Sequence, residues 1–253
     1  MSVSHAQLPF VAMILAGGLG KRLRAVVSDR PKVMALAGGV PFLEILIESL
    51  AGKGVREFVL LTGYKSRMIE EYFRQRYQGE LRIRISRELE PLGTGGAVRN
   101  AAELATDPVL LVNGDTFYDA DLQALFRYHM EKGGEVSLSL FRVDDVSRYG
   151  SVSVDEAGRV KGFIEKSDSL SGPGLINAGL SLLSLRFIVG LPMGRPYSME
   201  RDIFHAFAAT GKMFGLVGEH PFFDIGTPES YQAFQRYVQD RKGISERSSS
   251  INP

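Results

Sequence analysis

The chain has 253 residues, enough for one large or two small domains and for a core that needs no covalent cross-links. Its composition, 44% hydrophobic and 23% charged, excludes disordered, collagen-like and coiled-coil chains. Thirty basic and 29 acidic residues leave a net charge of +1, so we expect no general attraction to nucleic acid or membranes. The absence of cysteine excludes disulfides, thiolate metal sites and a cysteine nucleophile.

No targeting or membrane-spanning segment is expected. The first nine residues lack the charged start of a signal peptide, and the apolar run at 10–16 is too short to cross a bilayer. A longer apolar stretch at 175–193 is interrupted by Asn177 and Arg186. We therefore expect a soluble cytoplasmic protein.

Three short apolar runs, at residues 10–15, 58–63 and 108–114, predict strands that are covered on both faces. The segments 41–54, 65–77 and 94–105 predict helices between or beside them. Strands alternating with helices predict βαβ units and an α/β layered fold.

The second half of the chain predicts strands at 135–143 and 175–184, and a strand pair at 149–166 around a turn at 155–158. We interpret these strands as insertions that extend the sheet. Without a linker between the halves, we expect one domain over residues 1–240. The Ser-rich segment 241–253 predicts a frayed tail.

A glycine-rich turn with several cations follows the first strand, in the sequence LAGGLGKRLR at residues 15–24. Such a turn at the carboxyl end of a parallel strand is a common ligand site, and its backbone N–H groups can surround phosphate oxygens. Together with the nearby Lys32, it indicates a polyphosphate site. The turn lacks the glycine spacing of the dinucleotide fingerprint and of the P-loop, and an ordinary βα turn with solvated charges fits the pattern equally well. The failed fingerprint also disfavours an NAD-linked dehydrogenase.

Two acidic residues end apolar runs far apart in the sequence. Asp115 follows the third predicted strand, and Asp224 follows two phenylalanines shortly before Thr227-Pro228, which predicts the start of a terminal helix. A carboxylate that faces a polyphosphate requires a cation between them, and Mg²⁺ commonly uses one or two carboxylates plus phosphate oxygens. A turn or helix-capping role for Asp115 remains open at this point.

Two further segments carry candidate ligand contacts. ELEPLGTGGA, at residues 88–97, places Glu88 and Glu90 before a glycine-rich helix start, where a carboxylate could accept two N–H groups of guanine. GFIEKS places Glu165 and Lys166 at the end of a strand. A plain helix start and a solvated ion pair are the competing interpretations.

In this order, LAGGLGKRL, DRPKVMA, EPLGTGGA, VNGDTF, RYG, FIEK, LINAGL and FFDIGTPESY resemble the motifs of sugar-1-phosphate nucleotidylyltransferases, over residues 15–231. Within that family, GVPFLEILIESL, EPLGTGGA and NGDTF are similar to the D-glycero-α-D-manno-heptose 1-phosphate guanylyltransferases. The resemblance implies a Rossmann-like three-layer sandwich with a mostly parallel, mixed central sheet. It also implies that GTP and a sugar 1-phosphate react, with Mg²⁺, to give a GDP-sugar and pyrophosphate. A homo-oligomer is compatible with it.

The resemblance also implies roles for individual residues. The catalytic residues would be Arg22, Lys32 and Asp115, and the metal ligands would be Asp115 and Asp224. The nucleotide would contact Leu15, Ala16, Gly17, Gly18, Gly20, Lys21, Glu88, Glu90, Gly93 and Thr94. The sugar phosphate would contact Gly150, Glu165, Lys166 and Asn177.

The sequence departs from the family pattern at Lys21, where Thr or Ser is usual, at Val33, where proline is common, and in the segment MERD at residues 199–202. None of these departures removes a group that the chemistry requires. Synthesis of GDP-mannose, or of dTDP- or UDP-glucose, stays open. A non-catalytic nucleotide-sugar sensor is disfavoured because Arg22, Lys32, Asp115 and Asp224 are all present.

Overall fold

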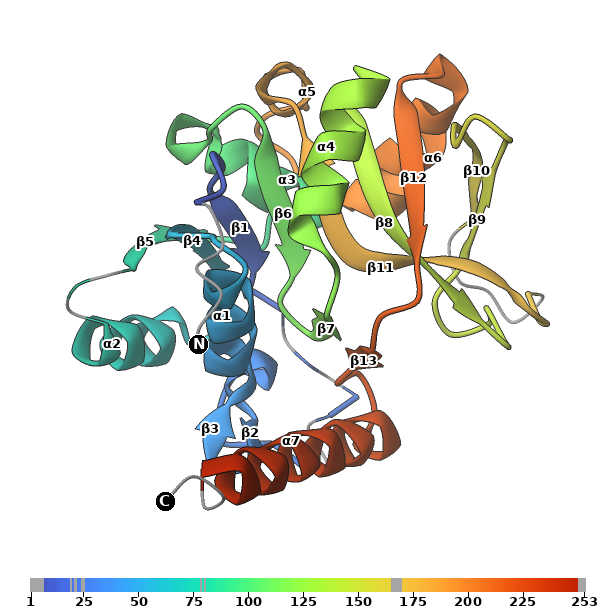
Figure 1. Ribbon diagram of the computed structural model, residues 1–253. Coiled ribbons are helices and arrows are strands. Elements are labelled where there is room, and N and C mark those ends of the chain that lie inside the picture. Colours follow the sequence, from blue (N-terminus) through green and yellow to red (C-terminus); the bar gives the residue numbers. More distant parts are fainter. Residues whose placement is uncertain are drawn as a thin grey trace.

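The computed structural model describes residues 7–18, 20, 22–23, 26–77, 79, 81–164 and 170–249, the last eight without their side chains. Across these residues, nine strands form one sheet (Figure 1). Its main path follows the order β10, β9, β11, β6, β1, β4, β5, and β8 and β12 continue from β11.

The three apolar runs form the parallel centre of this sheet: β1 (Ala12–Leu15), β4 (Glu57–Thr62) and β6 (Val109–Asn113). β1 lies between the other two, with Leu15 opposite Leu61 on one side and Asn113 on the other. Successive residues of each strand belong to two different core clusters, Ile14 to one and Met13 to the other. Both faces are therefore buried, which explains why these runs are continuously apolar rather than alternating.

The remaining strands extend the sheet as the sequence predicts. β11 (Gly174–Leu183) is antiparallel to β6 and to β8 (Val136–Val143), and β12 (Met213–Gly218) is parallel to β8. The hairpin of β9 (Ser151–Val154) and β10 (Val160–Ile164) continues from β11. β5 (Arg82–Arg87), which is not among the predicted strands, forms the opposite edge beside β4.

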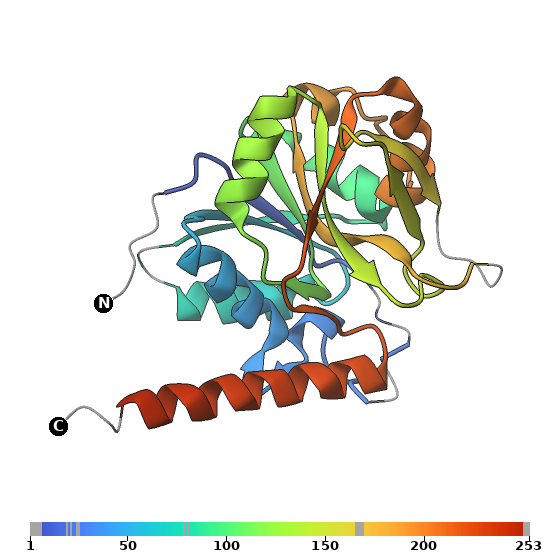
Figure 2. The ribbon, with the colours of Figure 1, turned by 45° about the vertical axis from the view of Figure 1, so that its right-hand side comes forward.

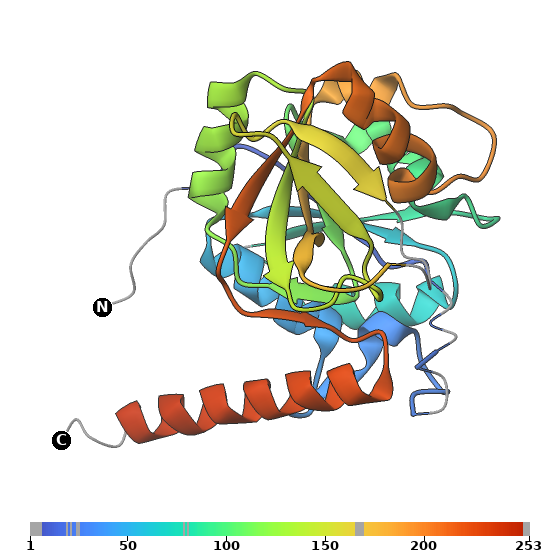
Figure 3. The same cartoon turned by 90° about the vertical axis from the view of Figure 1, so that its right-hand side faces the viewer.

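Helices cover both faces of the sheet. α1 (Phe42–Gly52), α2 (Ser66–Arg76) and α4 (Leu122–Lys132) contribute to one core cluster. α3 (Gly93–Asn100), α5 (Leu185–Val189) and the π-helical turn η3 (Met199–Phe204), which continues into α6 (His205–Phe207), lie against the other. Figure 3 shows the two helical layers on either side of the strands. The predicted α/β three-layer fold with a mostly parallel, mixed sheet is confirmed.

The strand order reverses next to β1. The chain runs from β1 through α1 to β4 and through α2 to β5, and then α3 leads to β6 on the opposite side of β1. The connections that leave β1 and β6 at their carboxyl ends therefore separate in opposite directions. Such a switch point leaves a crevice where α/β proteins bind ligands.

A second, smaller sheet attaches the end of the chain to this crevice. β7 (Thr116–Tyr118) pairs antiparallel with β13 (Phe222–Asp224), and α7 (Pro228–Ser249) follows directly. Thr227 accepts a hydrogen bond from the backbone N–H of Ser230 at 3.3 Å, so its predicted capping role is confirmed. α7 crosses below the rest of the molecule (Figure 2).

The backbone of α7 is helical as far as Ser249, beyond residue 241, where the sequence predicts a frayed tail. Tyr231, Phe234 and Val238 give the helix a buried stripe, and a helix anchored in this way propagates at little cost into residues that would not start one. The division into a domain and a tail stays a prediction. Over the described residues, no helix combines the length and the apolar content needed to cross a bilayer.

Asp119 ties three elements together below the sheet. Its carboxylate accepts from Lys53, at the end of α1, at 2.7 Å and from Arg241 of α7 at 3.0 Å, while its backbone N–H donates to Pro221. Burial by itself raises the pKa of Asp119, but the hydrogen bond and charge of Lys53, with those of Arg241, hold that pKa below its usual value.

We expect Asp119→Asn to lower the free energy of unfolding by about 1 kcal/mol at pH 7. A carboxyl with a lower pKa in the folded state stabilises the protein above its unfolded pKa of about 3.9 and loses that effect as the pH falls through the folded pKa. Urea unfolding at pH 7 and pH 3 should therefore show a deficit that shrinks in acid. Asp240→Asn, at an exposed position of α7 next to Arg241, is the control. An equal deficit at both pH values would contradict this assignment.

Candidate active site

A cavity of about 790 Å³ opens at the switch point of the sheet. Its walls come from the glycine-rich turn after β1, the connection after β4, the β5–α3 connection, the end of β6, the β8–β9 connection and the β13 segment. Its volume is within the range of small-molecule sites.

The cavity brings most of the predicted site residues together. It is lined by Leu15, Gly17, Gly18, Arg22, Lys32, Glu88, Glu90, Gly93, Thr94, Asn113, Asp115, Asn177 and Asp224. Of these, Asn113 is not among the sequence predictions. Ala16 is buried in the core beneath the turn, and Gly20 and Gly150 do not contribute to the lining. Lys21, Glu165 and Lys166 lie outside the described residues, so their roles stay predictions.

The glycines of the first turn leave room for protein side chains as well as for a ligand. A Cβ on Gly17 would lie 2.8 Å from Oε1 of Glu88, and a Cβ on Gly20 would lie 2.7 Å from Cβ of Lys32. Gly20 also has a φ of +58°. Gly18, by contrast, has open space where its Cβ would be. Two of the three glycines thus position Glu88 and Lys32, and the third faces the cavity.

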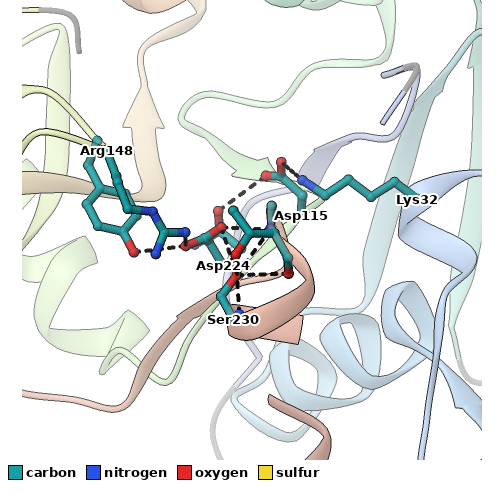
Figure 4. Close-up of polar contacts among 9 residues, drawn as sticks. Lys32, Asp115, Arg148, Asp224 and Ser230 are labelled. Atoms are coloured by element: carbon teal, nitrogen blue, oxygen red, sulfur yellow. Dashed lines mark hydrogen bonds and ion pairs between the residues drawn. The ribbon is translucent and has the colours of Figure 1, made fainter. Parts of the chain in front are cut away.

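The two predicted metal carboxylates are neighbours. Asp224 pairs with Thr116 across the β7–β13 ladder, and the N–H of Ile225 donates to the backbone carbonyl of Asp115 at 2.9 Å. Both side chains line the cavity, next to each other in Figure 4. The β7–β13 pairing therefore joins groups that lie 224 − 115 = 109 residues apart.

Each carboxylate has its own cation. Lys32 Nζ lies 2.6 Å from Asp115 Oδ2, and Arg148 Nη2 lies 3.3 Å from Asp224 Oδ2. Burial opposes ionisation of Asp115, but the charge and hydrogen bond of Lys32, aided by the Thr116 hydroxyl, hold the pKa of Asp115 below its usual value. Asp115 is therefore ionised at neutral pH.

Further contacts fix Asp224 in place. The Tyr149 hydroxyl donates to Asp224 Oδ2 at 2.8 Å, and the N–H of Gly226 donates to Oδ1 at 2.7 Å. Burial and the Asp224 carboxylate raise the pKa of Tyr149 to about 12, so its hydroxyl stays a donor. Arg22 is close by, with Nη2 3.8 Å from the position that a Cβ on Gly226 would take.

The donor set suits magnesium. Asp115 and Asp224 supply carboxylate oxygens, and among the described residues no third acidic, His or Cys side chain joins them in a cluster. Mg²⁺ is usually bound by one or two carboxylates, with substrate phosphates and water completing its shell. Two carboxylates at the edge of a ligand-sized cavity fit that pattern.

The β5–α3 connection forms another wall. Glu88 Oε2 accepts the N–H of Leu92 at 2.9 Å, and burial raises the pKa of Glu88 despite this hydrogen bond. Its second oxygen lies against Gly17 and Gly63, where a Cβ would come within 2.8 and 2.5 Å. Glu88 therefore links this connection to the glycine turn, whereas Glu90 is exposed.

The start of α3 is fastened to η3. Gly93 has a φ of +69°, and a Cβ there would lie 2.4 Å from the carbonyl of Tyr197. The hydroxyl of Thr94 accepts the N–H of Met199 at 2.7 Å and donates to Glu200 at 3.3 Å. Thr94 thus reaches the cavity while its hydroxyl joins two elements that are distant in sequence.

The structure adds residues that sequence reasoning missed, namely Tyr64, Arg87, Arg148, Tyr149, Phe163, Ser198, Glu200 and Phe222. Arg148 and Tyr149 belong to the segment RYG that carries part of the family resemblance, so a signal for them was present. Phe163 and Phe222 begin the quoted segments FIEK and FFDIGTPESY, and Glu200 lies in MERD, so a signal was present for these residues as well. Tyr64, Arg87 and Ser198 stand in segments whose pattern does not distinguish them from surface or core residues.

The chain is similar to known proteins over most of its length. The sequence matches the nucleotidyl transferase family over residues 11–241. The chain therefore belongs to this family. It is 38% identical to the D-glycero-alpha-D-manno-heptose 1-phosphate guanylyltransferase of Aneurinibacillus thermoaerophilus, covering 90% of this chain and 98% of that protein. It is 37% identical to the mannose-1-phosphate guanylyltransferase of Mycobacterium tuberculosis, covering 87% of this chain and 62% of that protein.

A solved structure of this family has a similar fold. The crystal structure of HddC from Yersinia pseudotuberculosis gives a TM-score of 0.81 at 34% identity, covering 90% of this chain and 99% of that one. The structure of HddC complexed with GMP-PN gives a TM-score of 0.78 at 33% identity, with the same coverage. The family that the motifs predict is thus confirmed.

Gly114, which precedes Asp115, packs directly against the first strand. A Cβ there would lie 2.1 Å from the carbonyl oxygen of Leu15, which accepts the N–H of Gly114. We expect Gly114→Ala to destabilise the protein by about 1–3 kcal/mol because backbone must shift. Gly52→Ala, at an exposed helical position with open space, should instead be neutral or stabilise by about 0.5–1 kcal/mol. Urea unfolding of both variants tests this, and equal stabilities would contradict it.

Proposed function

We propose that this chain is a guanylyltransferase that converts GTP and D-glycero-α-D-manno-heptose 1-phosphate into GDP-heptose and pyrophosphate, with Mg²⁺. We further propose that it acts in the cytoplasm, because both substrates are charged metabolites made inside cells. The observation that carries the proposal is the convergence of Asp115 and Asp224, each with its own cation, beside the glycine-rich turn in one cavity. The relatives named for heptose 1-phosphate support the choice of sugar.

The proposed reaction needs positioning and charge stabilisation more than acid–base chemistry. An oxygen of the sugar phosphate attacks the α-phosphorus of GTP in line, the bond to the bridging oxygen breaks, and pyrophosphate leaves with its electron pair. The nucleophile already carries negative charge at neutral pH, so no strong base is required. No covalent enzyme intermediate is formed. The difficulty lies in bringing several anionic groups together.

The residues of the cavity have the chemistry for these tasks. Open backbone at Gly18 can approach the triphosphate, and the guanidinium of Arg22 can hold two phosphate oxygens of the future pyrophosphate. Lys32, which Gly20 positions, can contact the α-phosphate. Asp115 and Asp224 would hold Mg²⁺, which when bound would neutralise phosphate charge.

Base and sugar recognition would involve other parts of the lining. Glu88 keeps one carboxylate oxygen that accepts no hydrogen bond from Leu92, and Glu90 is exposed on the same connection, so either can accept N–H groups of guanine. On the wall formed by β11, Asn177 can contact sugar hydroxyls. The proposal also includes the predicted contacts of Glu165 and Lys166 with the sugar phosphate.

Mannose 1-phosphate is the second candidate substrate. Identity to the mycobacterial mannose-1-phosphate guanylyltransferase is 37%, close to the 38% found for the heptose enzyme. The two sugars differ by one hydroxymethyl group, and such a difference is worth only about 1–3 kcal/mol in a pocket. A direct comparison of substrates must therefore decide.

A pyrophosphate-release assay with GTP, dTTP and UTP against heptose, mannose and glucose 1-phosphates tests the function. We expect kcat/KM for GTP with heptose 1-phosphate to exceed every other pair by at least about tenfold. A higher value with mannose 1-phosphate would replace the sugar assignment. Binding of a nucleotide sugar without pyrophosphate release from any pair would favour the regulatory interpretation instead.

Asp115→Asn should lower turnover by on the order of 10²–10³-fold or more at saturating Mg²⁺, because the cation whose charge would stabilise the transition state loses a carboxylate ligand. Asp240→Asn, exposed on α7 and outside the cavity, is the matched control and should keep wild-type turnover. Thermal unfolding of both variants checks that Lys32, left without its ion-pair partner, has not disturbed the fold. Turnover of Asp115→Asn within about threefold of wild type would refute the metal-site assignment.

A further inference from the structure

Arg148 lines the cavity and contacts Asp224, but the proposed function above gives it no role. It lies in the connection between β8 and β9, and its Nη2 donates to Asp224 Oδ2 at 3.3 Å. The same oxygen accepts the Tyr149 hydroxyl at 2.8 Å. The guanidinium also lies 5.4 Å from the centre of the Tyr149 ring. Arg148 therefore neutralises Asp224 from the edge of the cavity.

Arg148 is held less firmly than Lys32, the cation of the neighbouring pair. The Arg148 side chain is 46% exposed, and its single hydrogen bond is long, whereas the Lys32 side chain is 12% exposed and lies 2.6 Å from Asp115. Arginine carries five N–H donors in a planar fork, and within the described part of the chain only one of those on Arg148 has an acceptor. With respect to the described residues, most of its donors are therefore available to a ligand.

We propose that Arg148 is an exchangeable counter-ion, which neutralises Asp224 in the free protein and binds the phosphate of the sugar 1-phosphate in the substrate complex. The proposal rests on the proposed function. Asp224 cannot serve Arg148 and a cation equally well, because each would repel the other. When a divalent cation takes the Asp224 carboxylate, the freed guanidinium faces the cavity and matches the oxygens of a phosphate.

The position of Arg148 favours the sugar phosphate over the triphosphate. Figure 4 shows Lys32 and Arg148 on opposite sides of the two carboxylates. Lys32 is packed against Gly20 of the glycine-rich turn, while Arg148 and Tyr149 precede β9, which pairs with β11, the strand that carries Asn177. In an in-line displacement the attacking and leaving groups occupy opposite sides of the phosphorus. A cation on the far side from the nucleotide turn is therefore placed for the attacking substrate.

The first test is steady-state kinetics of Arg148→Ala and Arg148→Lys with GTP and the sugar 1-phosphate. We expect KM for the sugar phosphate to rise at least about tenfold in Arg148→Ala, as for loss of a charged hydrogen bond, and less in Arg148→Lys. KM for GTP should stay within about threefold. Arg142→Ala, on the exposed face of β8 and outside the cavity, is the matched control and should behave as wild type. A rise in KM for GTP alone would overturn the assignment to the sugar phosphate.

The second test is the binding of Mn²⁺ to the protein without substrates, followed by electron paramagnetic resonance. If Arg148 competes with the cation for Asp224, Arg148→Ala should bind Mn²⁺ up to about fivefold more tightly. Unchanged or weaker binding would mean that Arg148 does not compete with the cation, and would overturn the exchange. Asp224→Asn should lose Mn²⁺ affinity and shows that the signal comes from this site.

These outcomes separate the inference from the proposed function. A wild-type protein that releases no pyrophosphate from any substrate pair refutes the function. If the wild-type protein is active and the KM values of Arg148→Ala are unchanged, only the role of Arg148 is refuted. Thermal unfolding of both Arg148 variants should match wild type, because Arg148 is exposed and lies outside the core clusters.

Discussion

The short antiparallel pairing of β7 with β13 is the contact on which the site depends. Only three residue pairs make up this ladder, yet it sets Asp224 beside Thr116 and ties Ile225 to the backbone of Asp115. So small a ladder would be marginal alone. Phe117, Phe223, Phe234 and Tyr237 pack around it with ring centroids 4.7–6.2 Å apart, so that the terminal helix stabilises the ladder. The geometry of the two carboxylates therefore depends on the packing of α7 against the β7–β13 ladder.

Bringing two carboxylates together creates a charge problem that the fold solves locally. The protein as a whole is nearly neutral, so the compensating charges must be close. They come from two unrelated elements, Lys32 after the glycine-rich turn and Arg148 from the β8–β9 connection. The two carboxylates are thus each paired with a cation before any ligand arrives. Such preorganisation lowers the cost of charge rearrangement during a reaction.

The parts of the fold that the sequence predicts are those governed by local rules. β1, β4 and β6 are apolar throughout because both of their faces are buried. The carboxyl ends of parallel strands lie at the same edge of a sheet, and Asp115 could therefore be predicted to face the glycine-rich turn. β5 was not predicted because it lacks the continuous apolar run of a strand buried on both faces. Only Ile83 and Ile85, which alternate with Arg82 and Arg84, mark its one core-facing side. The contact of Arg148 with Asp224 depends on a tertiary pairing between segments 76 residues apart, which no local pattern encodes.

The glycine-rich turn shows why a correct motif can still be misread in detail. From sequence, the natural expectation is that each glycine makes room for phosphate. In the structure, Gly17 makes room for the Glu88 carboxylate and Gly20 for the Lys32 side chain, and only Gly18 is left open. A side chain at Gly17 or Gly20 would thus displace a protein group first and a ligand only indirectly. The turn therefore acts as a template that sets Glu88 and Lys32 on either side of a single open backbone position.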